Sequence, residues 1–231
     1  MDWTEYIAAG LVFLAAHRIP TVPSIRARLA KALGERGYLI SYSVVSLVFL
    51  WWLIEAAGRA PYIELWSSAY WQAWIPVVAM LFACLLIVLA VGAPNPLSFG
   101  GGRSDGFDPG CPGIAGAARH PMLWALAIWS VAHIFPNGNV AHVILFGAFC
   151  VFAIYGMRII DRRMQRRLGF SRWQELARAT SFWPFQSVLE GQWRTELKRV
   201  DCSALIRIVG AVSVYVVLMW SHDLVIGVSP L

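Results

Sequence analysis

The chain has 231 residues, of which 58% are hydrophobic and only 14% charged, and its formal net charge is +6. Soluble domains contain roughly 45–50% apolar residues, so this composition argues against a soluble globular protein and predicts an integral membrane protein. The positive charge is unevenly distributed in the manner of a membrane topology, so we expect no nucleic-acid partner.

Six apolar segments follow one another along the chain, several of them near the roughly 20 residues that a membrane helix needs. We therefore predict an all-α fold, a single polytopic membrane bundle of about six transmembrane helices over residues 1–231. The predicted spans are about Trp3–His17, Tyr38–Ala57, Trp74–Ala93, Leu123–Phe135, Val140–Ile160 and Leu205–Ile226. The first and fourth are short, which indicates thin or re-entrant passages.

Lysine and arginine are concentrated in alternate connections. The first loop holds five, the third two, and the region from Arg158 to Arg207 eleven, whereas the opposite side has only Arg59. Positive residues mark cytoplasmic loops, so we expect a multi-pass protein of the bacterial inner membrane with both termini on the outer side. The N-terminus lacks the basic region of a signal peptide, so the first segment is expected to stay as a helix.

Two connecting segments have distinctive compositions. Residues 94–118 are rich in Gly and Pro, which predicts a flexible cytoplasmic loop, and this loop lacks the Gly-Lys-Ser/Thr ending of a nucleotide-binding P-loop. Residues 161–204 form a basic segment that continues the fifth span at the membrane interface. Within it, Asp161 is expected to pair with Arg158 or Arg162, or to orient a histidine.

Histidines near the ends of apolar segments are the main candidates for chemistry, because ionisable groups at membrane depth are costly and often functional. His17 ends the first segment beside Arg18, and His120 begins the fourth beside Arg119. A haem b needs axial imidazoles and cations near its propionates. The topology places His17 and His120 at similar depth, whereas His133 lies about 20 Å further along the fourth helix. A lone membrane histidine is equally often a packing residue.

A second interpretation comes from the run Arg119-His120-Pro121-Met122. It resembles the Arg-His-Pro-aromatic motif of intramembrane isoprenylcysteine and phospholipid methyltransferases, which implies a methyltransferase-like membrane fold and S-adenosylmethionine as cofactor. Arg119 and His120 would then hold the carboxylate of that cofactor at a helix N-terminus. The chain departs from this pattern at Met122 and in lacking the paired glutamates of the later segment.

A further set of motifs occurs together and in order: Ala16-His17, Gly34-Glu35-Arg36, Arg119-His120-Pro121, Trp129-Ser130-Val131-Ala132-His133, Asn137-Gly138-Asn139 and Ile160-Asp161-Arg162-Arg163. This combination resembles the NnrU family, whose other branch is the 15-cis-zeta-carotene isomerase. The resemblance implies haem b, with His17 and His133 as iron ligands, and a role in denitrification or in isomerisation of a polyene. Ser130 stands where the isomerase has a cysteine, which argues against a thiolate switch.

The leading hypothesis is a haem b membrane protein of redox or nitrogen-oxide metabolism, or one with isomerase-like chemistry at an apolar or small-molecule ligand. Arg18 and Arg119 would neutralise propionates, and His120 with Arg119 would be catalytic. Depth favours His120 as the second iron ligand and the resemblance favours His133, so both stay open. The alternatives are the methyltransferase and a non-enzymatic haem-delivery factor with a respiratory or denitrification partner.

Overall fold

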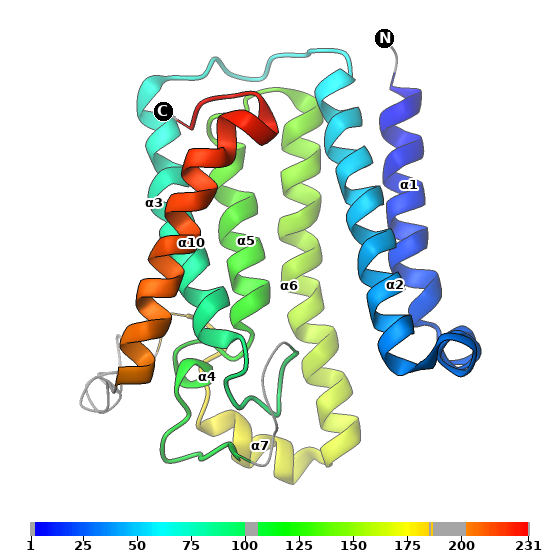
Figure 1. Ribbon diagram of the computed structural model, residues 1–231, viewed down its shortest axis with the longest axis vertical. Helices are drawn as coiled ribbons and strands as arrows, with labels where there is room; N and C mark the ends of the chain where they lie inside the picture. The colour runs from blue at the N-terminus through cyan, green and yellow to red at the C-terminus, as the bar shows by residue number, and fades with distance from the viewer. Residues whose placement is uncertain (1–2, 100–105, 185, 187–201, 231) are drawn as a thin grey trace. The chain divides into compact units, whose positions relative to one another are not determined.

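The computed structural model describes residues 3–99, 106–184, 186 and 202–230. Within these ranges the chain is helical, apart from connecting loops and isolated bridge residues such as Glu64 and Asn139, which confirms the all-α class. The helices are α1 (Thr4–Arg18), η1 (Ile19–Thr21), α2 (Pro23–Arg59), α3 (Tyr70–Ala90), α4 (Ile114–Ala117), α5 (Pro121–Ile134), α6 (Val140–Leu168), α7 (Phe170–Arg178) and α10 (Cys202–Ile226) (Figure 1).

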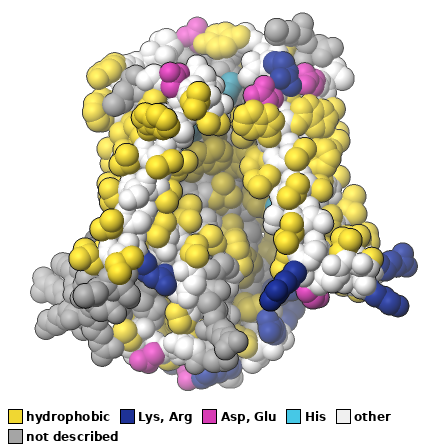
Figure 2. Space-filling model, viewed as in Figure 1, with side chains coloured by type: hydrophobic (Ala, Val, Ile, Leu, Met, Phe, Trp, Pro, Cys, Tyr) yellow, Lys and Arg dark blue, Asp and Glu magenta, His cyan; other side chains and the backbone are white. Residues whose placement is uncertain are grey.

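Each of the six apolar segments of the sequence forms a helix. Four helices in the described part of the chain are long and apolar enough to cross a membrane, namely α2, α3, α6 and residues 204–226 of α10. Helices α1 and α5 have 15 and 14 residues, fewer than a bilayer needs if they cross it alone. Figure 2 shows hydrophobic side chains along the helices and charged side chains near helix ends, as in a membrane protein.

The chain divides into two compact units, and each is described by itself. The first comprises residues 1–67 and 138–145. In it α1 and α2 form an antiparallel pair joined by the short helix η1 (Figure 1). The Tyr6 hydroxyl donates to the Ala141 carbonyl at 2.9 Å, and the Leu65 N–H donates to the Gly138 carbonyl at 2.7 Å. These bonds fasten the start of α6 to this unit.

The helix α2 begins much earlier than the span predicted from Tyr38. Pro23 occupies the first helical turn, where its missing N–H costs nothing and its fixed φ favours a helix. The chain bends at Gly34, which has φ 72° and ψ 161°, a conformation that glycine adopts readily and other residues rarely do. Most of the segment between the first two predicted spans is therefore helical on both sides of a kink.

The second unit comprises residues 68–137 and 146–231. Its core lies where α5 meets α6, around the buried side chains of Leu123, Ala127, Ala153 and Met157. As the helical spacing of its apolar residues predicts, α6 continues past Asp161 to Leu168. The chain then turns at Gly169, with φ 80°, into the short amphipathic helix α7.

The two distinctive connecting segments are partly described. Residues 94–118 contain the single-turn helix α4 between stretches of loop, and residues 100–105 of this segment lie outside the described residues. The basic segment 161–204 includes the end of α6 and the whole of α7, while residues 187–201 lie outside the described residues. Leu97 from the first segment is fully buried against Leu176 and Ala177 of α7, so the two segments pack together.

Candidate functional site

The motif Arg119-His120-Pro121 lies at the start of α5, and local chemistry sets its shape. Pro121 is the first helical residue and His120 is the residue before the helix. Hydrogen bonds hold the backbone of Arg119, just before His120, at both its N–H and its carbonyl. The Arg119 N–H donates to the Ser181 carbonyl at 2.7 Å, and the Asn95 side-chain amide donates to the Arg119 carbonyl at 2.9 Å. Both side chains of the motif are thereby fixed beside α6.

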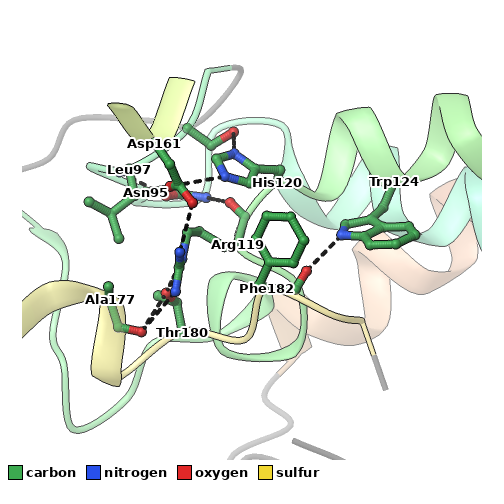
Figure 3. A network of polar contacts seen from close by, with 10 residues as sticks. Asn95, Leu97, Arg119, His120, Trp124, Asp161, Ala177, Thr180 and Phe182 are labelled. Carbon is green, nitrogen blue, oxygen red and sulfur yellow. Dashed lines mark hydrogen bonds and ion pairs between the residues drawn. The ribbon is translucent and has the colours of Figure 1, made fainter. Parts of the chain in front are cut away.

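A single carboxylate, that of Asp161 on α6, joins the two side chains (Figure 3). Arg119 donates from Nη1 to Asp161 Oδ2 at 2.9 Å, and His120 Nε2 lies 3.2 Å from Oδ1. Because an ionised carboxylate accepts only, His120 Nε2 carries the proton in this bond. The structure confirms that Asp161 contacts a histidine, but its arginine partner is Arg119, 42 residues away, and not Arg158 or Arg162 as expected.

The rest of the Arg119 guanidinium is also used. Its Nε donates to Thr180 Oγ1 at 2.8 Å and its Nη2 to the Ala177 carbonyl at 3.2 Å. The group lies 5.3 Å from the centre of the Trp173 ring, a favourable cation–π geometry. Arg119 is buried, at 8% exposure, and each of its three nitrogens has a partner. It fastens the end of α7 to α6.

His120 is fully buried, and both of its ring nitrogens are engaged. Nε2 donates to Asp161, and Nδ1 lies 3.1 Å from Ser98 Oγ. In the neutral imidazole Nδ1 accepts the hydroxyl proton of Ser98. To ligate iron or touch a substrate, His120 would have to give up one of these bonds. Its arrangement is that of an anchoring residue.

His133, at the other end of α5, has a different environment. Its Nδ1 lies 2.8 Å from the Trp129 carbonyl, and because a carbonyl only accepts, Nδ1 carries the proton. The lone pair of the neutral imidazole therefore lies on Nε2. Aromatic rings surround it, with Trp129 at 5.4 Å and Phe146 at 5.3 Å between centroids. Metal-ligating histidines typically donate their second N–H to a carbonyl or carboxylate in this way.

His17 belongs to the first unit, whereas Arg119, His120 and His133 belong to the second. It lies in the last turn of α1, between the rings of Phe13 and Tyr42 at 5.6 and 5.5 Å. The neighbouring Arg18 is exposed, and its Nη1 lies 3.3 Å from Thr21 Oγ1. The structure thus brings together two of the predicted site residues, Arg119 and His120, around Asp161.

Two tryptophans of α5 pack inside the second unit. Trp124 donates from Nε1 to the Phe182 carbonyl at 2.8 Å (Figure 3), and Trp129 packs against Phe146 and Phe149. Sequence reasoning missed Ser98 and Thr180 as partners of the motif. They are isolated hydroxyl residues in loops, and no periodicity or spacing in the sequence singles them out.

No group of three or more His, Cys, Asp or Glu side chains gathers around a common point in the described part of the chain.

Comparison with known protein families gives one match, in which the profile described as NnrU protein covers residues 5–230. The chain belongs to the NnrU family. The match spans nearly the whole sequence, so both units of this NnrU protein lie within it. Comparisons with curated proteins and with solved structures gave no match.

Proposed function

We propose that this NnrU protein binds haem b in the membrane and acts in redox or nitrogen-oxide metabolism, with His133 as one axial ligand. The observation that supports the proposal is the bond from His133 Nδ1–H to the Trp129 carbonyl. It fixes the tautomer, sets the ring plane and leaves Nε2 as the ligating nitrogen. The same bond makes the imidazole a better donor to iron.

The surroundings of His133 fit a porphyrin. Trp129 and Phe146 present aromatic surface beside the imidazole, and such walls exclude water from a haem pocket. Bound there, haem would supply an iron centre whose potential and reactivity depend on its ligands and on the apolar surroundings. His17 remains the expected second ligand and Arg18 an expected propionate partner, both on the strength of the sequence resemblance. Isomerase-like chemistry on a polyene is a more specific activity that the same haem would allow.

The contacts of His120 bear on the choice between the two candidate ligands. Both of its nitrogens are bonded within the protein, whereas His133 uses one nitrogen to orient the other. We therefore propose His133 over His120 as the ligand from α5. A catalytic role for His120 and Arg119 stays a prediction that requires their bonds to Asp161 to open.

The same contacts weigh against the methyltransferase alternative. In that alternative Arg119 and His120 hold the carboxylate of S-adenosylmethionine, but the carboxylate that they contact is Asp161 of the same chain. The haem-delivery alternative shares the haem site and differs only in how readily haem leaves. Transfer of haem to apomyoglobin, measured over hours, separates a delivery factor from a protein that retains its haem.

The proposal is tested by the visible spectrum of the detergent-purified protein, oxidised and then reduced with dithionite. We expect a Soret band and sharpened bands on reduction in the wild type and in His120→Gln. We expect His133→Ala and His17→Ala to lose most of the bound haem. A colourless wild type grown with added haem, or full haem content in His133→Ala, would contradict the assignment. Loss in His120→Gln alone would return the ligand role to that residue.

A further inference from the structure

The outward side of α6 in the second unit carries an exposed apolar stripe. Val151, Tyr155 and Ile159 follow one another at four-residue spacing, which places them along one side of the helix. Their side chains are 57%, 65% and 60% exposed. On a helix long and apolar enough to cross a membrane, an exposed stripe of this kind faces the hydrocarbon of the lipid.

The same side of α6 changes from apolar to basic within one turn. Arg163 and Arg167 continue the four-residue spacing of the apolar stripe, and Arg158, Arg162 and Arg166 form the neighbouring row. All five are exposed. The opposite side stays with the core, where Met157 is fully buried and Met164 and Leu168 pack beneath α7. The arginines therefore project outward from the end of a lipid-facing surface.

The five arginines differ from some other exposed arginines of the described residues in their ion pairs. The described residues contain no ion pair to any of them. By contrast, Arg26, Arg59 and Arg172 each pair with a glutamate at 2.6–2.8 Å, and Arg59 pairs with a second one as well. The carboxylate within their own stretch, Asp161, faces inward to Arg119 and His120. Among the described residues, the charged side chains on the outward surface at this end of α6 are thus all arginines.

An aromatic side chain flanks the arginines. After the turn at Gly169, Phe170 begins α7 with 63% of its surface exposed, while Leu176 and Ala177 later in α7 are buried. Arginines together with exposed aromatic and aliphatic side chains are typical of helices at the boundary between hydrocarbon and headgroups. Residues 158–178 use seven arginines and no lysine.

We infer that this end of α6 is a binding site for an anionic phospholipid. Arg158, Arg162 and Arg166 contact its phosphodiester, and Tyr155 and Ile159 lie against its acyl chains. The planar guanidinium donates two parallel bonds to phosphate oxygens, which explains a row built of arginine. The cationic and apolar surfaces are continuous, which favours a lipid over a soluble anion. The acyl chains of a lipid cover the apolar stripe, whereas a soluble anion would contact only the arginines.

The test uses the full chain in detergent, with dioleoylphosphatidylglycerol and dioleoylphosphatidylcholine as probes and native mass spectrometry to count bound lipid. We expect the anionic lipid to bind at least tenfold more tightly than the zwitterionic one. Arg158→Gln/Arg162→Gln/Arg166→Gln should weaken it by about fivefold for each arginine removed. Size-exclusion elution and tryptophan fluorescence verify that the variant is folded.

A matched control removes the same charge elsewhere. Arg26→Gln/Arg59→Gln/Arg172→Gln takes away three exposed arginines that already have carboxylate partners, and it should keep the lipid preference within twofold. Equal binding of the two lipids, or an equal loss in both triple variants, would overturn the inference. Displacement of the anionic lipid by 10 mM inorganic phosphate would overturn it in favour of a free-anion site. The readout needs no haem, so it is independent of the proposed function.

Discussion

The two histidines at the ends of α5 differ in how many of their ring nitrogens are hydrogen-bonded. At the start of the helix a carboxylate and a hydroxyl take both nitrogens of His120, and the side chain is fully buried. Near its end a carbonyl takes one nitrogen of His133 and orients the other. A histidine with both ring nitrogens bonded inside the protein stabilises the fold, whereas one with a single nitrogen bonded to a carbonyl has its other nitrogen oriented for a ligand. The comparison predicts that stability depends mainly on the first end and haem mainly on the second.

The largest effect on stability is expected for Asp161→Ala. It leaves the buried Arg119 and His120 without their shared acceptor, and breaking a buried pair in this way costs about 3–5 kcal/mol. The loss is measured as a lower midpoint of thermal or denaturant unfolding in detergent. The control is Glu175→Ala, whose pair with Arg172 is exposed on both sides and should cost less than about 1 kcal/mol. Similar losses in the two variants would remove the distinction between the buried network and a surface pair.

A smaller loss is expected for Arg119→Lys. The ammonium group keeps its attraction to Asp161 but cannot reproduce the planar set of bonds to Thr180 and Ala177. We expect a loss of about 3 kcal/mol, the lower end of the range for two hydrogen bonds from a charged group. The unfolding midpoint measures it, with Arg172→Lys as the exposed control. A lysine variant as stable as the wild type would show that charge alone maintains this end of α5.

At the other end of α5, His133→Ala should cost the haem-free protein only about 1–2 kcal/mol. The substitution removes one hydrogen bond to a backbone carbonyl and the ring contacts with Trp129 and Phe146, and it strands no buried charge. Unfolding of the haem-free wild type and variant gives the difference. If His133→Ala destabilised the haem-free protein as much as Asp161→Ala, its role would be structural and the contrast between the two ends would fail.

The smallest effect is expected for Ser98→Ala. It removes one hydroxyl partner of His120 Nδ1 and leaves the bond to Asp161 in place, so a loss of about 1 kcal/mol follows. The unfolding midpoint again measures it, and the haem content should equal that of the wild type. A change in the haem spectrum of this variant would show that the two ends of α5 are coupled.

The helices could be predicted from the sequence because apolar runs of sufficient length specify them locally. The helices α3 and α6 follow from the apolar runs predicted over Trp74–Ala93 and Val140–Ile160, although α3 begins four residues earlier and α6 continues to Leu168. The early start of α2 was missed because its first turns carry Arg26, Arg28 and Lys31, which resemble a loop in a hydropathy profile. A basic helix and a basic loop have the same composition, and only the Pro23 start distinguishes them.

The site could be predicted only in part. The motif identified Arg119 and His120, and the position of Asp161 at the end of an apolar run marked it as a residue that pairs or orients. Which partners it takes depends on how the second unit packs, since Asp161 lies one turn from Arg158 and 42 residues from Arg119. Thr180 and Asn95 contribute through loops whose conformations tertiary contacts decide, so the sequence carries no local signal for them.

The separation of Arg119 from Asp161 also bears on how the protein is made. During synthesis α5 leaves the ribosome before α6 does, so Asp161 is not yet beside Arg119 and His120 when they emerge. Until Asp161 arrives, both side chains need water or lipid headgroups, which keeps the start of α5 at an aqueous boundary. The ion pair forms later, and Ser181 and Thr180 of the segment after α7 then bond to Arg119. These contacts fix the position of this short helix. In a chain truncated before residue 161, the first turn of α5 should therefore be accessible to aqueous reagents.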